Sequence, residues 1–108
     1  MEVQFTEENG VVIAKVDGEI NISTSPQLKK DFEKVDAKKL VINLEGVGYV
    51  DSSGLATLVE ILKKTRGRGG ALHLTNLSDK VKSLFEITKL DKLFGIYSDV
   101  KGAVSEFK

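Results

Sequence analysis

The sequence predicts a single α/β domain: a mixed, mostly parallel β-sheet with an N-terminal hairpin, packed against about four helices. Its 108 residues, without internal repeat or linker, suit one small domain spanning residues 1–108. Short β-branched and apolar runs alternate with amphipathic helical patterns, which is typical of parallel strands joined by right-handed crossovers. Asn9-Gly10 separates the first two strand patterns, and this dipeptide favours the tight turn of a hairpin.

The hairpin accounts for the N-terminal residues. Residues 3–7 alternate apolar and polar side chains, the pattern of a half-buried strand. Residues 11–16 are largely apolar and rich in β-branched side chains, and Gly18 ends this second strand. Because a tight turn joins the two strands, they are expected to run antiparallel, and the sheet is expected to be mixed.

A first helix begins near Pro26. Proline is tolerated in a first turn because its missing N–H has no partner within the helix there. Thr24 with Gln27 fits a capping box, whereas proline at the first helical position favours Ser25 as the cap, so Thr24 and Ser25 are both candidates. The predicted apolar face of this helix consists of Leu28, Phe32 and Val35.

Residues 40–44 form a nearly continuous apolar run, which indicates a central strand buried on both faces. A loop at 45–50 leads into a clearly amphipathic helix, which the glycines of residues 67–70 end. The rest of the pattern predicts a strand at 71–75, a helix capped by Ser78, a short strand at 93–97 and a helix capped by Asp99. The apolar faces of these three helices consist of Leu55, Leu58, Val59 and Leu62; of Val81, Leu84 and Phe85; and of Val100, Ala103, Val104 and Phe107.

The composition argues against several classes of function. Sixteen basic residues balance sixteen acidic ones, so we expect no direct nucleic-acid binding. The chain has no cysteine and one histidine, so we expect no metal site. No apolar run approaches the roughly 20 residues of a membrane span. The N-terminus also lacks the layout of a secretion signal, so we expect a cytoplasmic protein without membrane insertion.

The adjacent serines Ser52 and Ser53 raise the possibility of a serine hydrolase. A serine nucleophile needs a nearby base, but the single histidine, His73, lies in a predicted strand, where its side chain faces either solvent or a covering helix. The nucleophile-elbow pattern G-x-S-x-G is absent around Ser52 and Ser53. The basic, glycine-rich segment at 66–70 follows a helix, whereas a phosphate-binding loop precedes one. We therefore expect no enzymatic activity.

The segment Asp51-Ser52-Ser53-Gly54 has a structural and a functional interpretation. In the structural one, Asp51 or Ser52 caps the following helix. In the functional one, the loop brings these residues to the carboxyl edge of the sheet, where α/β folds build their sites, and a phosphoserine there faces the positive end of the helix dipole. Gly54 is expected to leave the surface beside Ser53 bare for a partner. Local chemistry leaves Ser52 and Ser53 open as acceptors.

Several stretches of the chain match the motifs of one bacterial family. They are Val41-Ile42-Asn43-Leu44 followed by Tyr49-Val50-Asp51-Ser52-Ser53-Gly54-Leu55, Gly18-Glu19-Ile20 before Thr24, and residues 78–93. The chain thus resembles the STAS-domain anti-sigma factor antagonists, of the sporulation stage II protein AA type. The resemblance covers essentially the whole chain and implies a single STAS-like domain; D-S-S-G-L is its most specific part.

The resemblance implies a regulatory switch without enzymatic activity. In this family the unphosphorylated antagonist binds an anti-sigma factor that is also a serine kinase, and a sigma factor is thereby released. The kinase uses ATP to phosphorylate the second serine of the motif, which implies Ser53, and a PP2C-type phosphatase resets the switch. The antagonist itself needs no cofactor. The implied contacts to the anti-sigma factor are Glu19, Asn21, Ser23, Thr24, Asp51, Ser52, Ser53, Gly54 and Leu55.

Two positions depart from the pattern of the family. Members commonly have an acid where this chain has Asn21, and many have glycine where it has Ala56. Asn21 is expected to lie near Ser53, so partner affinity or handling by the kinase is expected to differ. The alternative function is that of a STAS subunit in a lipid-transport or other membrane-associated complex, and the intact D-S-S-G segment favours the antagonist.

Overall fold

The structure, a computed structural model, describes residues 1–107. Within them, strands alternate with helices after an initial pair of strands, as the sequence predicts. The elements are β1 Glu2–Glu8, β2 Val11–Asp17, α1 Ser25–Glu33, β3 Lys39–Gly46, α2 Ser52–Gly67, β4 Ala71–Thr75, α3 Asp79–Ile87, the 3₁₀ helix η1 Leu90–Lys92, β5 Gly95–Tyr97 and α4 Val100–Ser105.

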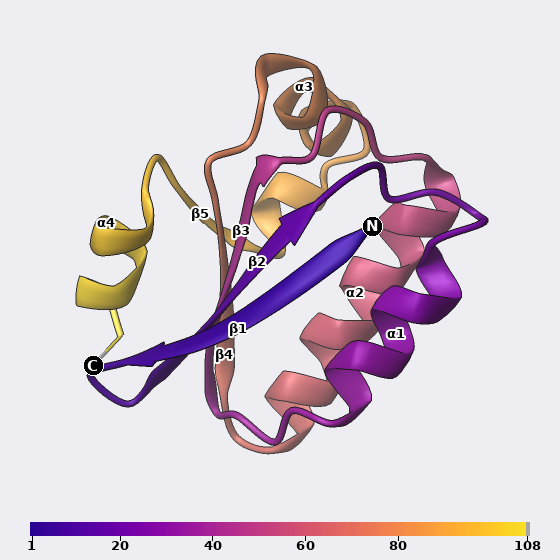
Figure 1. The fold of residues 1–108 in the computed structure, drawn as a ribbon. Helices are drawn as coiled ribbons and strands as arrows, with labels where there is room; N and C mark the ends of the chain where they lie inside the picture. The colour runs from indigo at the N-terminus through magenta and orange to yellow at the C-terminus, as the bar shows by residue number, and fades with distance from the viewer. Residues whose placement is uncertain (108) are drawn as a thin grey trace.

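The strands form one sheet in the order β1-β2-β3-β4-β5 (Figure 1). β1 and β2 are antiparallel, whereas the three other neighbouring pairs are parallel. Asn9 and Gly10 join the hairpin with φ angles of 53° and 77°, the left-handed backbone that an Asn-Gly turn adopts readily. The predicted fold class, a mixed and mostly parallel sheet with an N-terminal hairpin, is confirmed.

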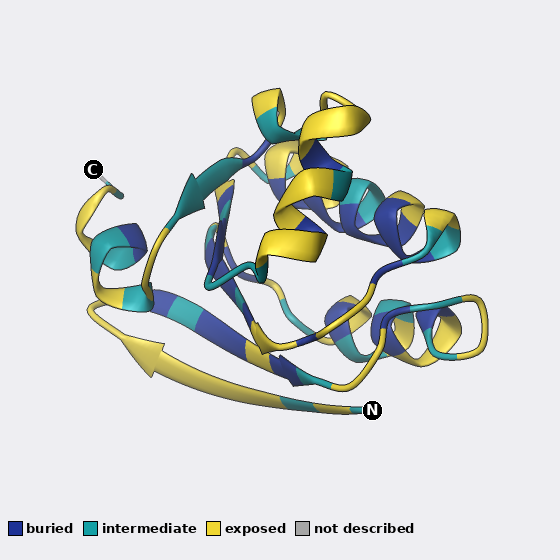
Figure 2. Ribbon diagram, turned by 90° about the horizontal axis from the view of Figure 1, so that it is seen from above, coloured by how far each residue is buried: buried dark blue, intermediate teal, exposed yellow. Residues whose placement is uncertain are grey.

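Helices cover both faces of this sheet. α1 and α2 lie side by side on one face, α4 lies on the other, and α3 lies beyond the ends of β2 and β3 (Figure 1). Figure 2 shows β2 largely buried, whereas β1 exposes most of its residues at the sheet edge. Val41 and Ile42 of β3 are fully buried on opposite faces, which confirms the predicted central strand. Burial of each such side chain stabilises the fold by about 1.5–3 kcal/mol.

The first helix differs in detail from its prediction. It ends at Glu33, so Val35 lies outside it, and the Val35 N–H donates to the Phe32 carbonyl at 3.1 Å in a closing turn. Of the two candidate caps, Thr24 occupies the N-cap position and Ser25 is the first helical residue. The Thr24 side chain does not cap the helix, so the candidate capping box with Gln27 is absent. The Thr24 hydroxyl donates instead to the Glu19 carbonyl at 2.8 Å, because the preceding loop folds back over it.

The last strand is shorter than predicted. It begins at Gly95 rather than Leu93. The N–H groups of Leu93 and Phe94 both donate to the Leu90 carbonyl, at 2.9 and 3.3 Å, and this turn withdraws them from the sheet. The caps predicted for the last two α-helices are confirmed: Ser78 accepts from the Val81 N–H, and Asp99 accepts from the Gly102 N–H.

Candidate functional site

Two loops meet at the carboxyl edge of the sheet. The β2–α1 loop (residues 18–24) and the β3–α2 loop (residues 47–51) leave parallel strands at the same edge. Their backbones are bonded to each other: the Ile20 N–H donates to the Tyr49 carbonyl at 3.1 Å, and the Asp51 N–H donates to the Ile20 carbonyl at 3.0 Å. The two loops therefore form one continuous platform at the start of α2.

Asp51 joins this platform to the helix. It is the N-cap of α2, and its Oδ1 accepts from the Gly54 N–H at 2.8 Å. Its Oδ2 accepts from the Ile22 N–H at 3.0 Å. Of the two candidate caps, Asp51 holds the position and Ser52 is the first helical residue. One carboxylate thus fixes the helix start and the β2–α1 loop together.

Asn21 orders the β2–α1 loop from within. Its Oδ1 accepts from the N–H groups of Ser23 and Thr24, at 2.9 and 3.1 Å, and its Nδ2 donates to Glu19 Oε2 at 3.3 Å. The Thr24 hydroxyl accepts from the Asn21 N–H at 2.9 Å. This is an Asx-type turn, in which a short polar side chain replaces backbone partners. The amide at this position accepts and donates, which a carboxylate cannot do.

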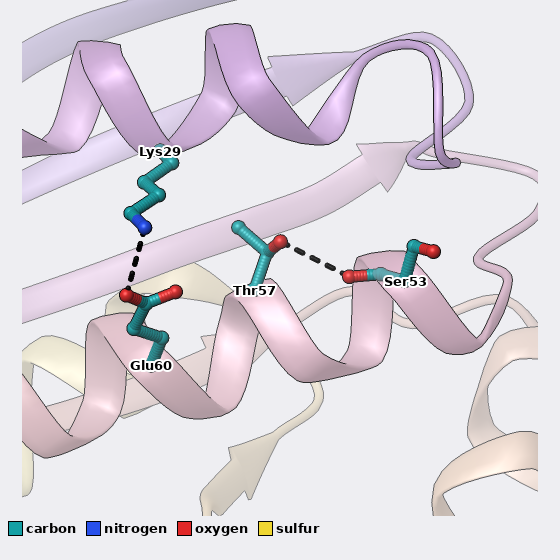
Figure 3. Close-up of polar contacts among 4 residues, drawn as sticks. All are labelled: Lys29, Ser53, Thr57 and Glu60. Carbon is teal, nitrogen blue, oxygen red and sulfur yellow. Dashed lines mark hydrogen bonds and ion pairs between the residues drawn. The ribbon is translucent and has the colours of Figure 1, made fainter.

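Ser53 lies in the first turn of α2, half-buried, beside the exposed Ser52. The Ser53 carbonyl accepts from the Thr57 hydroxyl at 3.0 Å, while the Ser53 hydroxyl points away from Thr57 toward the start of the helix (Figure 3). The unsatisfied N–H groups of a first turn favour negative charge. A negatively charged group on the Ser53 hydroxyl would therefore face the favourable end of the helix dipole.

Gly54 has a different role from the one expected. A Cβ at this position would lie 2.6 Å from the Ile20 carbonyl oxygen and 2.8 Å from Val50 Cγ1. The space beside Gly54 is therefore interior, and the expectation of a bare surface there is wrong. The missing side chain lets α2 approach the two loops closely. Leu55 is also buried, so these two residues shape the site from inside.

Sequence patterns missed two apolar side chains on the platform. Ile22 is 72% exposed and Tyr49 is 38% exposed. Lys80 of α3 lies over Tyr49, with Nζ 5.1 Å from the ring centroid. The signal for Ile22 was present as a lone aliphatic residue within the polar run Asn21-Ile22-Ser23-Thr24, but neither helical nor strand periodicity covers such a loop position.

An ion pair neutralises the lysine of α1 that faces α2. Lys29 Nζ lies 3.0 Å from Glu60 Oε1, on the same side of α2 as Ser53 and Thr57 (Figure 3). The hydrogen bond to Glu60, with its charge, raises the pKa of Lys29. The hydrogen bond to Lys29 lowers the pKa of Glu60. The two charges are thus satisfied by each other at neutral pH.

The single histidine is part of the packing of α4. His73 Nδ1 lies 3.0 Å from the Ala103 carbonyl, which can only accept, so Nδ1 donates. The His73 ring stacks on Phe107 with centroids 4.0 Å apart. Of the two orientations left open, His73 therefore faces a covering helix. α4 and α2 lie on opposite sheet faces (Figure 1), so His73 is no base for Ser53.

The site is a surface rather than a cavity. A cavity of about 1000 Å³ lies along β1 and the end of α1, and the residues that line it belong to neither loop of the platform. In residues 1–107 no group of three or more metal-binding side chains comes together. None of the helices in the described chain is long and apolar enough to cross a membrane.

The site is thus the start of a helix in an α/β domain, where the Ser53 side chain lies beside two loops that are hydrogen-bonded to each other. The chain belongs to the STAS domain family, whose model matches residues 2–103. It is 33% identical over 99 residues to the anti-sigma-B factor antagonist of Bacillus subtilis, covering 90% of each chain. It is 30% identical over 99 residues to that of Staphylococcus aureus, covering 89% of this chain and 92% of the relative. An anti-sigma factor antagonist structure from Mycobacterium paratuberculosis superposes with a TM-score of 0.87 at 26% identity, covering 96% of this chain and 91% of that one.

Proposed function

We propose that this chain is an anti-sigma factor antagonist controlled by phosphorylation. Unphosphorylated, it binds an anti-sigma factor that is also a serine kinase, and a sigma factor is released. The observation that carries the proposal is the placement of Ser53 in the first turn of α2, on a helix start that Asp51 fixes to the neighbouring loop. The names of the Bacillus and Staphylococcus relatives support the class of partner.

The kinase supplies the chemistry of the switch. It transfers the γ-phosphoryl group of ATP to Ser53: an Oγ–P bond forms, the bond to ADP breaks, and the hydroxyl proton passes to a base of the kinase. This chain contributes the acceptor hydroxyl alone, so the proposal requires no cofactor and no enzymatic activity of its own. A PP2C-type phosphatase hydrolyses the phosphate, and all partners meet in the cytoplasm.

The phosphate acts on docking rather than on folding. It adds a charge of about −1.5 to −2 at the positive end of α2. The start of α2 already accommodates one negative charge, the carboxylate of Asp51. Lys29 is paired with Glu60, so it is not free to neutralise the phosphate. A partner surface fitted to the neutral hydroxyl must desolvate or repel the added charge, and each loss of about 1.4 kcal/mol weakens binding tenfold.

Mass spectrometry tests the acceptor directly. The protein is incubated with ATP and a purified, kinase-type anti-sigma factor that is encoded in the same genome. We expect one phosphate on the wild type and on Ser52→Ala, and none on Ser53→Ala, because only Ser53 is the acceptor in the proposal. Phosphate that persists on Ser53→Ala moves the site to Ser52 or elsewhere and contradicts the proposal.

A further inference from the structure

The exposed Ile22 stands beside the candidate phosphoacceptor. Single exposed apolar residues are common and need no explanation by themselves. Ile22 is 72% exposed and lies outside both core clusters of the described residues. The Ile22 side chain therefore does not contribute to the packing of the core. What distinguishes it from the similarly exposed Ile87 is its place on the platform, where its N–H is bonded to the residue that caps α2.

Hydrogen bonds fix the loop on both sides of Ile22. Its own N–H donates to Asp51 Oδ2 at 3.0 Å, and Asn21 Oδ1 receives the N–H groups of Ser23 and Thr24. Isoleucine is also stiff at χ1 because it is β-branched. A side chain that is ordered before binding loses little conformational entropy when a partner covers it. Ile22 is therefore an exposed apolar side chain whose backbone is already ordered before a partner binds.

One residue, Asp51, connects the backbone of Ile22 to the start of α2, the helix that carries Ser53. Asp51 binds the Ile22 N–H with one carboxylate oxygen and the Gly54 N–H with the other. Ser53 directly precedes Gly54 in the first turn of α2. Tyr49 exposes a second apolar surface on the same platform. A protein that brings ATP to the Ser53 hydroxyl must cover this platform.

We propose that Ile22 is the apolar anchor by which the anti-sigma factor recognises this chain. The side chain inserts into an apolar pocket of the anti-sigma factor, surrounded by the exposed polar groups of Glu19 and Ser23. Interfaces concentrate binding energy in a few such anchors ringed by polar contacts that exclude water. This inference rests on the proposed function and extends it: Ser53 carries the control, whereas Ile22 carries affinity and partner choice.

Calorimetric titration with the ADP-loaded, kinase-type anti-sigma factor tests the anchor. Ile87, 78% exposed at the end of α3, supplies the matched control, because Ile87→Ala removes the same side-chain atoms from α3 rather than from the β2–α1 loop. We expect Ile22→Ala to weaken binding about tenfold or more and Ile87→Ala to change it less than about twofold. In steady-state phosphorylation, Ile22→Ala should raise KM with kcat nearly unchanged, because the contact is equally present in ground and transition states.

The outcomes separate the two proposals. If Ile22→Ala binds like Ile87→Ala while Ser53 is still phosphorylated, the anchor is overturned and the proposed function stands. If the kinase leaves wild-type Ser53 unmodified, the proposed function falls and the anchor falls with it. Thermal melts of both variants by circular dichroism should match the wild type, since neither isoleucine contributes to the core; a melting temperature lowered in Ile22→Ala alone overturns the anchor in favour of a structural role.

Discussion

At the scale of single residues, Asp51 combines the capping of a helix with a contact between two loops. The sequence reduced the cap to Asp51 or Ser52, because local chemistry favours both residue types. What local chemistry omits is the second oxygen, which binds the Ile22 N–H from another part of the chain. The cap interaction is short-range and predictable, whereas the loop interaction depends on two parallel strands ending at the same edge.

Gly54 leads to a prediction about stability. Alanine in this first turn gains less than the roughly 1 kcal/mol of a helix interior, but it forces a Cβ to 2.6 Å from the Ile20 carbonyl oxygen. Overpacking of this kind costs about 1–3 kcal/mol or more, and here the closest atom is backbone, so Gly54→Ala should lower the free energy of unfolding. Urea denaturation measures the change.

Gly67 provides the control for Gly54. It also lies in α2, but a Cβ there meets nothing within 4 Å, so Gly67→Ala should be neutral or stabilising. Equal behaviour of the two alanine variants would show that helix propensity alone governs these positions. Residue type and spacing suggested a bare surface at Gly54; the true reason for glycine is a contact with Ile20, which no local pattern encodes.

At the scale of elements, α4 is held on the sheet by an apolar cluster and by one polar side chain of β4, His73. The helix spans only Val100–Ser105, too short to be stable alone. It is attached through buried Ala103, whose carbonyl receives the His73 Nδ1–H, and through Phe107, which stacks on the His73 ring. The Asp99 cap and apolar spacing predicted this helix correctly, but the orientation of His73 required the tertiary arrangement.

We expect His73→Ala to loosen α4 while the rest of the sheet stays folded. The variant removes one hydrogen bond and one ring stack, which together stabilise the attachment by about 1–3 kcal/mol. Native-state hydrogen exchange should therefore accelerate at residues 100–105 and remain slow in β2 and β3. Uniform acceleration across the sheet would instead show that His73 supports global stability rather than the docking of α4.

At the scale of the whole molecule, the features that the sequence predicted depend on residues close together in the chain, whereas the features that it missed depend on residues far apart in the chain. Hydrophobic periodicity and the Asn-Gly turn were sufficient for the sheet, its hairpin and its helices, because each signal is local and all of them agree. Two features required the folded chain: the platform made by the β2–α1 and β3–α2 loops, and the exposure of Ile22 on it. The candidate functional surface belongs to this second group, and composition and periodicity alone did not indicate it; the resemblance of the D-S-S-G-L segment to a known family led to the predicted function.

A phosphomimetic variant, Ser53→Asp, tests whether a negative charge at Ser53 weakens partner binding without changing the folding of the whole molecule. Ser53→Asp adds a charge at the N-terminus of α2, where helix electrostatics stabilise it by about 0.3–1 kcal/mol. The circular dichroism spectrum and melting temperature should therefore be retained, whereas affinity for the anti-sigma factor should fall about tenfold or more. Ser83→Asp, on an exposed position of α3, adds the same charge elsewhere and should leave both properties unchanged. Loss of structure in Ser53→Asp would overturn the argument from the helix dipole, because the control of docking would then act through unfolding.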